Sequence, residues 1–548
     1  MKGPFKAPSI WFVISLACLL ILGFFLLYPL VTVFLGSFGR GGASGWAMVF
    51  AEPKYGRAII NSLILALSVT GFASLIGVPL AWCSARYDFP GKVIVSMLPL
   101  ITLVIPEVIS AQTWLMLLGN NGVITQWLSR QGFNPPSFYG WFGLITVMSF
   151  TYYTYIYIGT LAAIRGFDIQ LEEAAQSLGT SPLLSRIRVV LPIVLPSILS
   201  SALLVFTLVL GNFAVAMILS HKIELLSVMT YQAAVSESGS DPALQSTLAS
   251  ISIAIVMLVL FAQRHILSGS RRETTQGRKA VAVRLTQWRG ALIGLLAGLV
   301  IVISLMPLAV LIAGAFTRAR GPVMRWGEWT FANIERVLNN APDPLINSLV
   351  YSLWATVIGI VASTLISYLI VKKRNSLTPL LDYIAMLPLA VSGTAIGISL
   401  LMTFNSGMVS MSGTAGIIIL AYIVRRFPLG VRNASSTLYN IHDSIEEASV
   451  SLGVPPFRSF LNVVLPLMVP AIMAATVLTW TTTVAELSAS IIVYSGGRET
   501  LPIQIFRLID SGLMAQASVY GLILVLMIIL PILAITRIMK VDLFSQGR

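Results

Sequence analysis

The chain has 548 residues, of which 56% are hydrophobic and 10% are charged, and its formal net charge at pH 7 is +14. So much apolar surface exceeds what a soluble protein of this length can bury, so the composition excludes an ordinary soluble fold. The sequence lacks the short alternating segments of a spanning β-barrel, whereas apolar runs of roughly 20 residues recur, the length that a helix needs to cross a bilayer. We therefore predict an all-α polytopic membrane protein.

About twelve segments are predicted to cross the membrane. The first six lie near residues 10–36, 58–84, 93–118, 141–165, 191–220 and 243–267. The second six lie near residues 289–315, 345–371, 377–405, 414–437, 464–495 and 512–537. Proline and glycine interrupt several of them, so re-entrant turns stay an open alternative at those breaks. The first segment is too long for a signal-peptide core and lacks a small-residue cleavage site, so we expect it to be retained.

The basic residues cluster between the predicted spans, where they act as orientation signals rather than as a nucleic-acid-binding surface. Those expected on the cytoplasmic side are Lys2, Lys6, Arg86, Lys92, Arg264, Arg271, Arg272, Arg278, Lys279, Arg284, Arg289, Lys372, Lys373, Arg374, Arg537, Lys540 and Arg548. This distribution predicts that both termini are cytoplasmic. Four arginines in the loop after the seventh span do not fit this distribution, because that loop would lie on the opposite side: Arg318, Arg320, Arg325 and Arg336.

Resident chemistry within the chain is not expected. Cys18 and Cys83 lie in separate predicted spans and His221, His265 and His442 are scattered, so neither a disulfide framework, a metal site nor a catalytic triad is indicated. A glycine-rich Gly-Lys-Ser/Thr phosphate loop is also missing from the sequence, so we expect no ATP or other cofactor to bind this chain.

An internal repeat divides the chain into two halves. The first copy comprises Glu173-Ala174-Ala175, Gly179 and Val189-Val190-Leu191-Pro192, and the second comprises Glu447-Ala448-Ser449, Gly453 and Val463-Val464-Leu465-Pro466. The copies are 274 positions apart (447 minus 173), which is half of 548. We predict two homologous six-helix halves in parallel orientation, residues 1–267 and 289–548, joined by a polar, basic cytoplasmic linker, residues 268–288.

Each copy lies in a loop of about 25 residues between the fourth and fifth spans of its half, which is long for a structureless connection. We expect a short helix that ends at Gly179 or Gly453, followed by a second that begins near a proline. In the second copy Asp443 is expected at the N-cap, with Glu446 three residues further on. An alternative is that both are amphipathic helices lying on the membrane surface, but that role would not require the same spacing in both halves.

The pattern Glu-Ala-Ala, three residues, Gly, nine residues and aliphatic-x-Leu-Pro resembles the signature loop of permeases in binding-protein-dependent ABC importers. Two departures from this pattern are mild: Ser449 replaces the second alanine in the second copy, and Val189 and Val463 stand where isoleucine is usual. The resemblance implies the type I importer permease fold and two coupling helices that dock on ATP-binding subunits. The residues it assigns to them are Glu172, Glu173, Ala174, Ala175, Gly179, Glu446, Glu447, Ala448, Ser449 and Gly453.

The same resemblance implies the partners. Two copies of an ABC ATP-binding subunit would lie on the cytoplasmic face and would hold ATP and Mg, so the chain itself would not be an enzyme. A periplasmic or lipid-anchored solute-binding protein would deliver cargo to the opposite face of a bacterial inner membrane, and lipid would surround the chain. No nucleic-acid partner is expected.

Three polar residues inside predicted spans are candidates for the transport path. Glu107 and Glu486 are ionisable groups at membrane depth, where such groups usually mark function. Glu486 aligns with Asn212 across the repeat, so both halves place a polar group at one depth. Two interpretations stay open at this point, a path-lining role and a structural hydrogen bond between helices.

The region 485–490 and Thr500-Leu501-Pro502 resemble the second half of permeases in the ferric-iron branch of the family. This resemblance implies ferric iron as the expected cargo, and an acidic Glu486 suits a hard cation better than an anion. The alternatives are 2-aminoethylphosphonate, another phosphorylated small molecule, thiamine or a polyamine. An ion-coupled secondary transporter would explain two six-helix halves but not the paired loops, and an intramembrane enzyme would need reacting groups within reach of one another.

Overall fold

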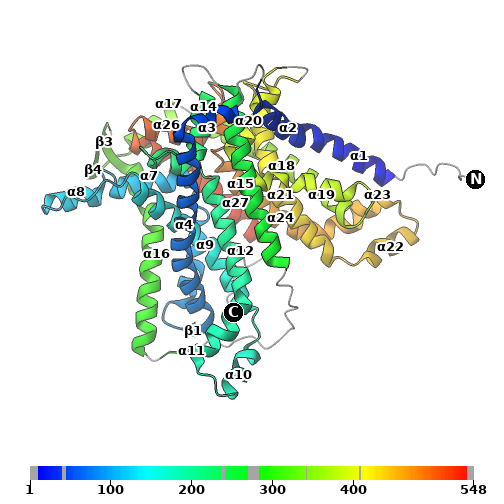
Figure 1. Cartoon of the computed structure of the whole chain (residues 1–548), viewed down its shortest axis with the longest axis horizontal. Helices are drawn as coiled ribbons and strands as arrows, with labels where there is room; N and C mark the ends of the chain where they lie inside the picture. The colour runs from blue at the N-terminus through cyan, green and yellow to red at the C-terminus, as the bar shows by residue number, and fades with distance from the viewer. Residues whose placement is uncertain are drawn as a thin grey trace, which may run out of the picture.

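Long helices account for nearly all of the architecture (Figure 1). This computed structural model describes residues 10–39, 45–235, 241–268, 283–285, 287–321, 323–340, 342–406 and 409–539. Within those ranges the predicted all-α polytopic class is confirmed. Lys2, Lys6, Lys540 and Arg548, and most of the predicted linker 268–288, lie outside the described residues.

The helices of the first half of the chain are α1 (Ile10–Leu22), α2 (Tyr28–Gly36), α3 (Gly45–Ala51), α4 (Pro53–Arg86), α5 (Lys92–Met97), α6 (Pro99–Thr102), α7 (Glu107–Leu118), α8 (Val123–Arg130), α9 (Trp141–Arg165), α10 (Ile169–Ser177), α11 (Pro182–Ser185), α12 (Leu191–Leu210), α13 (Ala214–Leu219), α14 (Leu226–Val235) and α15 (Pro242–Ser268). Turns of π-helix at Gly23–Leu27 and Arg186–Val190 make α1 continuous with α2 and α11 continuous with α12.

The second half contains α16 (Gln287–Phe316), α17 (Ala332–Asn340), α18 (Asp343–Val371), α19 (Thr378–Met386), α20 (Gly393–Phe404), α21 (Ala415–Asn440), α22 (Asp443–Ser451), α23 (Pro456–Ser459), α24 (Leu465–Val484), α25 (Ser490–Val493), α26 (Leu501–Asp510) and α27 (Met514–Met539). A π-helical turn at Phe460–Val464 precedes α24, as Arg186–Val190 precedes α12. Both turns lie just before a Leu-Pro pair, and proline has no N–H to continue the regular ladder.

Two small sheets join the ends of helices. Their strands are β1 (Tyr87–Asp88), β2 (Val283–Arg284), β3 (Thr317–Arg320) and β4 (Val323–Trp329), with β1 parallel to β2 and β3 antiparallel to β4. The β3–β4 hairpin carries three of the four arginines that depart from the charge pattern. Glu328 lies 3.8 Å from Arg318 and 3.2 Å from Arg325, so it offsets part of that local positive charge.

Eight helices in the described part of the chain are long and apolar enough to span a membrane. They are Ile10–Gly36, Pro53–Arg86, Pro182–Leu210, Pro242–His265, Trp288–Phe316, Asp343–Val371, Pro456–Val484 and Met514–Ile535. Two bent pairs of helices raise the number to ten. Helices α9 and α21 occupy the remaining predicted segments, but α9 is rich in tyrosine and threonine and α21 carries three arginines. The structure therefore does not confirm a count of twelve.

The two bent pairs lie within the predicted spans 93–118 and 377–405, where re-entrant turns had stayed an open alternative. Lys92–Thr102 and Glu107–Arg130 meet at 108°, and Thr378–Ala390 and Gly393–Phe404 meet at 114°. Proline explains the first break, because Pro106 holds an extended backbone at the N-cap of α7. In the second, the Ser392 side chain accepts a hydrogen bond from the N–H of Ala395 and starts α20. Non-helical backbone at membrane depth is tolerated where it lines a cavity or is buried in protein.

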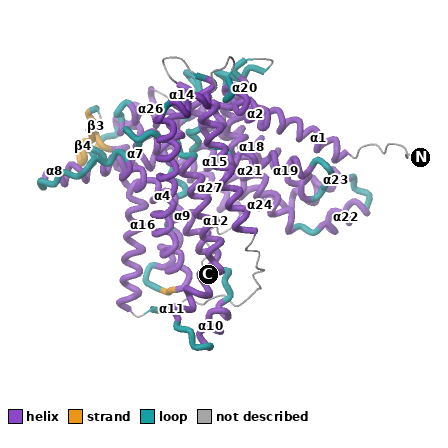
Figure 2. The backbone as a smooth tube through the Cα atoms, viewed as in Figure 1, coloured by secondary structure: helices purple, strands orange, loops and turns teal. Residues whose placement is uncertain are grey.

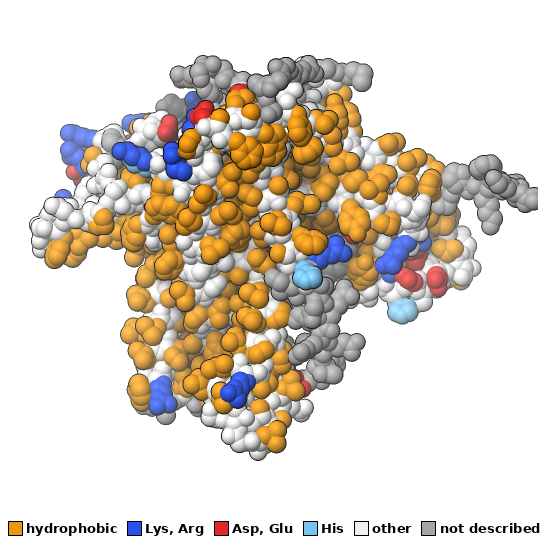
Figure 3. Space-filling view, in the orientation of Figure 1, with side chains coloured by type: hydrophobic (Ala, Val, Ile, Leu, Met, Phe, Trp, Pro, Cys, Tyr) orange, Lys and Arg blue, Asp and Glu red, His pale blue; other side chains and the backbone are white. Residues whose placement is uncertain are grey.

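Equivalent helices of the two halves pack in the same way. In the first half α4 packs against α9 and α12, and in the second α18 packs against α21 and α24 (Figure 2). Apolar side chains cover most of the face of the molecule in view, and the Lys and Arg side chains form small groups at its upper left, at its bottom and at the middle right (Figure 3). An apolar surface of this extent is what a lipid bilayer requires.

Candidate transport path and coupling loops

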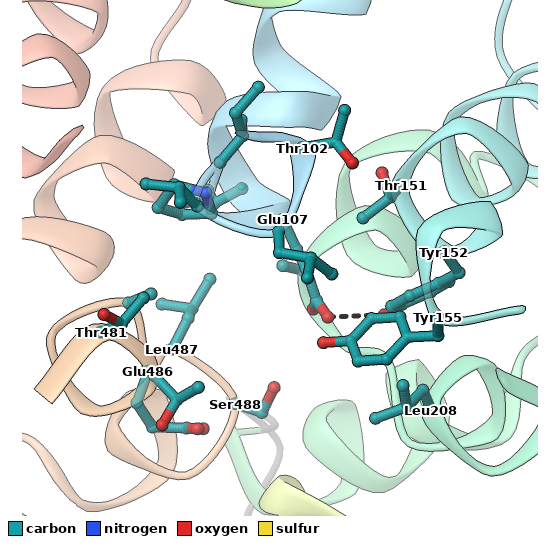
Figure 4. A pocket seen from close by; sticks show the side chains of 18 of the residues that line it. Thr102, Glu107, Thr151, Tyr152, Tyr155, Leu208, Thr481, Glu486, Leu487 and Ser488 are labelled. Carbon is teal, nitrogen blue, oxygen red and sulfur yellow. Dashed lines mark hydrogen bonds between the residues drawn. The ribbon is translucent and has the colours of Figure 1, made fainter. Parts of the chain in front are cut away.

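A central cavity forms where the bend in the first half meets helices of the second. Its volume is about 140 Å³, and its lining comes from residues 102–108, α9, α21 and the end of α24. Figure 4 shows Glu107, Tyr152 and Tyr155 on one side and Glu486, Leu487 and Ser488 on the other. The cavity thus lies between the two halves, which is where transporters built from repeats commonly bind their substrates.

In the wall contributed by the first half, the lining residues Glu107 and Tyr152 are hydrogen-bonded to one another and to Asn212, which does not itself line the cavity. The Tyr152 hydroxyl donates to Glu107 Oε1 over 2.5 Å, and Asn212 Nδ2 donates to Glu107 Oε2 over 2.8 Å. Asn212 Nδ2 also lies 2.7 Å from the Tyr152 hydroxyl, while its Oδ1 accepts from the N–H of Val215. Glu107 and Asn212, both predicted as path candidates, are therefore in direct contact.

The opposite wall contains an ion-paired triad. Glu486 Oε2 lies 2.6 Å from Arg425 Nε and 2.5 Å from Arg426 Nη2, while Oε1 accepts from the N–H of Ala489. Arg426 Nη2 also donates to the backbone oxygen of Thr482. Glu486 is only 3% exposed, so two guanidinium groups neutralise a carboxylate that would be costly to bury alone.

The two walls occupy equivalent positions in the repeat. Tyr152 is the twelfth residue of α9 and Arg426 the twelfth of α21, so each lies near the middle of its helix. Their partners Asn212 and Glu486 are equivalent as well, and both accept a bond from the backbone N–H three residues on. The same contact between helices is therefore made by a neutral pair, Tyr152 and Asn212, in the first half and by a charged pair, Arg426 and Glu486, in the second.

Glu107 and Gly393 begin equivalent helices after each bend, and here the halves differ. A Cβ added at Gly393 would lie 2.4 Å from Arg425 Nη1 and 2.5 Å from Ser488 Cβ. The absence of a side chain at Gly393 therefore allows the Arg425 guanidinium to lie against the start of α20.

Gly393→Ala is therefore expected to displace Arg425 and lower stability by about 1–3 kcal/mol, the usual cost of overpacking. Gly359→Ala is the matched control, because nothing lies within 4 Å of the added Cβ. Alanine there should leave stability unchanged or raise it by about 0.5–1 kcal/mol. Thermal unfolding of both variants in one detergent measures the difference, and equal midpoints would contradict the close-approach argument.

Sequence reasoning missed four of the groups that define the cavity, namely Arg425, Arg426, Tyr152 and Tyr155. The two arginines were detectable, because two adjacent charges inside the predicted span 414–437 are as costly as Glu486 itself. Tyr152 could have been found by moving back 274 positions from Arg426. The pairing of Arg426 with Glu486 brings together residues 60 positions apart and was not visible in either segment alone.

The two predicted coupling loops adopt the same fold. Helices α10 and α22 each end one residue before a leucine, and the next residue is glycine with positive φ, +88° at Gly179 and +87° at Gly453. The expected helix ends are confirmed, as is the second short helix in each loop at Pro182 and Pro456. The expected N-cap is wrong: α22 begins at Asp443 and its N-cap is His442.

The glutamate immediately before each motif, Glu172 or Glu446, points inward. Glu172 forms ion pairs with Arg86 at the end of α4 and, over 3.4 Å, with Arg186. Glu446 accepts from the Tyr368 hydroxyl over 2.6 Å and lies 2.7 Å from Lys373 Nζ. Both glutamates therefore tie their loop to the second span of their own half rather than presenting a carboxylate to solvent.

Asp443 adds a further tie, because its carboxylate pairs with Lys372. The Lys372 ammonium lowers the pKa of Asp443 below the usual range of aspartate. Because the folded-state pKa is depressed, this contribution is present above the ordinary pKa and is lost only as pH falls through the lowered value. The contact is therefore intact at neutral pH.

The opposite face of each loop is exposed. Glu173, Ala174, Glu447 and Ala448 are exposed, Ala175 and Ser449 are half-buried, and Gly179 and Gly453 lie at the exposed loop tips. Leu178 and Leu452 are equivalent and are 88% and 86% exposed. Figure 1 places α10 and α22 far apart from one another and away from the β3–β4 hairpin.

Comparison with known proteins defines the class. The family described as the inner membrane component of binding-protein-dependent transport systems matches residues 355–541. The chain belongs to this family and is the permease of an ABC importer, a multi-pass inner membrane protein and not itself an ATPase. Membership displaces the ion-coupled secondary transporter as the alternative class.

Three relatives show how far the similarity extends. The ferric transport system permease protein FbpB of Actinobacillus pleuropneumoniae is 26% identical over 542 residues, which covers 94% of this chain and 77% of that protein. A Sinorhizobium fredii protein described as an ABC transporter permease, y4fN, is 26% identical over 96% of this chain and 94% of its own length. A Salmonella typhimurium protein described as a 2-aminoethylphosphonate transport system permease, PhnV, is 30% identical over 247 residues, 44% of this chain and 91% of that protein.

Proposed function

We propose that this permease forms the path by which ferric iron, delivered by a solute-binding protein, enters the cell. The observation that carries the cargo assignment is the similarity to a ferric transport permease across 94% of the chain. Glu486 no longer supports it, because Arg425 and Arg426 already neutralise that carboxylate. Oxygen donors on the other wall, Glu107 with Tyr152 and Tyr155, are the type that a hard cation prefers.

The energy for transport is proposed to come from two ATP-binding subunits, which hold ATP and Mg. Each would dock on one coupling loop, and this is supported by the two loops sharing one shape and both exposing a leucine, Leu178 or Leu452, at equivalent positions. Residues 1–267 and 289–548 would then move as two halves joined by the linker 268–288. Both termini would lie on the cytoplasmic side with the loops.

A second cargo has its own supporting observation. A 2-aminoethylphosphonate carries a phosphonate group, and paired guanidiniums are well suited to bind such a group through parallel hydrogen bonds. Arg425 and Arg426 both line the cavity. The 30% identity to PhnV over 247 residues agrees with this alternative.

The deciding experiment is ATP hydrolysis by the complete importer reconstituted in lipid, with purified binding protein added with and without cargo. Stimulation by ferric-loaded binding protein alone would support the ferric assignment. Stimulation by the phosphonate-loaded form would transfer the assignment to the second cargo. If no ATP-binding subunit associates with the chain, the proposed energy source fails.

A further inference from the structure

The two walls of the central cavity carry opposite surplus charge. The two groups that hydrogen-bond to the Glu107 carboxyl, Tyr152 and Asn212, are neutral, so the formal charge of this wall is that of Glu107 alone. Across the cavity, Arg425 and Arg426 share the single carboxylate of Glu486. When formal charges at pH 7 are counted, one wall therefore carries one negative charge and the other carries one positive charge.

The positive wall also has unused capacity for hydrogen bonding. Each guanidinium carries five N–H donors. Both arginines approach the same oxygen, Oε2, of Glu486. Arg426 Nε is buried and has no hydrogen-bond partner in the part of the chain that the structure describes. A buried donor without a partner is costly, so a bound oxyanion would repay that cost.

The negative wall offers oxygen donors of a different kind. The Glu107 carboxylate and the Tyr152 and Tyr155 side chains line the same cavity (Figure 4). Carboxylate and phenol oxygens are hard ligands that attract ammonium groups and highly charged metal ions alike. The volume of about 140 Å³ accommodates a small solute rather than an extended chain.

We propose that this cavity is a binding site for a dipolar cargo, in which one small molecule or complex carries both a cationic centre and an oxyanion. The cationic end lies at Glu107 with Tyr152 and Tyr155, and the oxyanion lies at Arg425 and Arg426. Both a ferric ion coordinated by an oxyanion and an ammonium-bearing phosphonate have this chemistry. The inference rests on the proposed function as a permease for a small solute and adds a site that recognises both ends of the cargo.

Matched ligand pairs separate the two ends. Binding to the full chain in lipid nanodiscs is measured for 2-aminoethylphosphonate against ethylphosphonate, and for ferric pyrophosphate against pyrophosphate. In each pair only the positive centre differs. We expect wild type to prefer the dipolar member of at least one pair by about tenfold or more, the worth of one charge-assisted contact. The pair that shows the preference identifies the source of the positive charge.

Variants test each wall. Glu107→Gln removes the negative charge with little change of shape and should reduce the preference to about onefold. Glu486→Gln removes the carboxylate that competes for the arginines and should tighten ethylphosphonate or pyrophosphate binding several-fold. Glu224→Gln is the control, since Glu224 pairs with Arg57 outside the cavity, and it should behave as wild type.

Two outcomes would overturn the proposal: equal affinity of wild type for both members of each pair, or a preference that survives Glu107→Gln. These outcomes are independent of the hydrolysis experiment. If ferric-loaded binding protein stimulates hydrolysis but no ligand preference is found, the importer assignment stands and the dipolar site fails. If the preference is present but the binding protein gives no stimulation, the site stands and the proposed assembly fails.

Discussion

The double variant Leu178→Asp with Leu452→Asp is expected to lose its ATP-binding subunits while remaining folded in the membrane. Both leucines are more than four-fifths exposed, so their replacement removes little burial within the chain. If each fills a pocket on a partner, burying an aspartate there costs about 2 kcal/mol or more per site. Together these losses should weaken association by roughly a hundredfold or more. Copurification of the ATP-binding subunit with the tagged permease measures the effect.

The matched control is Leu338→Asp, an exposed leucine on α17 in the segment next to the β3–β4 hairpin. It should change neither copurification nor the elution profile of the permease on size-exclusion chromatography. Wild-type recovery of the ATP-binding subunit by the double variant would show that the loops are not the docking elements. In that case the alternative interpretation, that both loops are amphipathic helices lying on the membrane surface, would be favoured.

Removing both arginines of the ion-paired triad is the second change with a large expected effect. Arg425→Met with Arg426→Met leaves Glu486 buried without a counter-charge, which costs about 3–5 kcal/mol when one side of a buried pair is lost. We therefore expect a much lower unfolding midpoint and poor recovery of folded protein. Adding Glu486→Gln to the same chain should restore most of the stability, because no buried charge then remains in the triad.

Fluorescence-detected size-exclusion chromatography after graded heating compares the variants. Arg57→Met is the control, because its partner Glu224 lies in an exposed ion pair and such pairs contribute little. If the triple variant is as unstable as the double, the arginines act through packing rather than through the charge of Glu486. If the double variant is as stable as wild type, the triad is not needed for folding.

Two features of this fold could be predicted from the sequence: where the long helices lie, and which residues of the two halves are equivalent. Runs of apolar residues place the long helices, and the repeat reveals which residues of the halves are equivalent. Re-entrant turns were an open alternative, but the bends at Pro106 and Ser392 were not located, because a broken helix pair is as apolar in sequence as a straight span. The N-cap of α22 was misassigned by one residue because both His442 and Asp443 precede the same acidic turn.

At the candidate site, some residues could be predicted from the sequence, but their contact partners could not. Glu107, Asn212 and Glu486 were identifiable because polar groups at membrane depth are costly and therefore noticeable. Their partners depend on which helices become neighbours, which no single segment reveals. The cargo argument built on Glu486 fails for this reason: a carboxylate held by two arginines is not available to attract a cation. In the proposed site, Glu107 takes the role of the cation ligand instead.

The pairing of Tyr152 with Asn212 in one half and Arg426 with Glu486 in the other has an architectural consequence. In a dimer of identical subunits, two-fold symmetry would place the same residues on both sides of the axis, so an arginine pair would face another arginine pair. Joining two diverged copies in one polypeptide removes that restriction. The proposed path can then be polarised across its width, and a solute with opposite charges at its two ends would enter it in one preferred orientation.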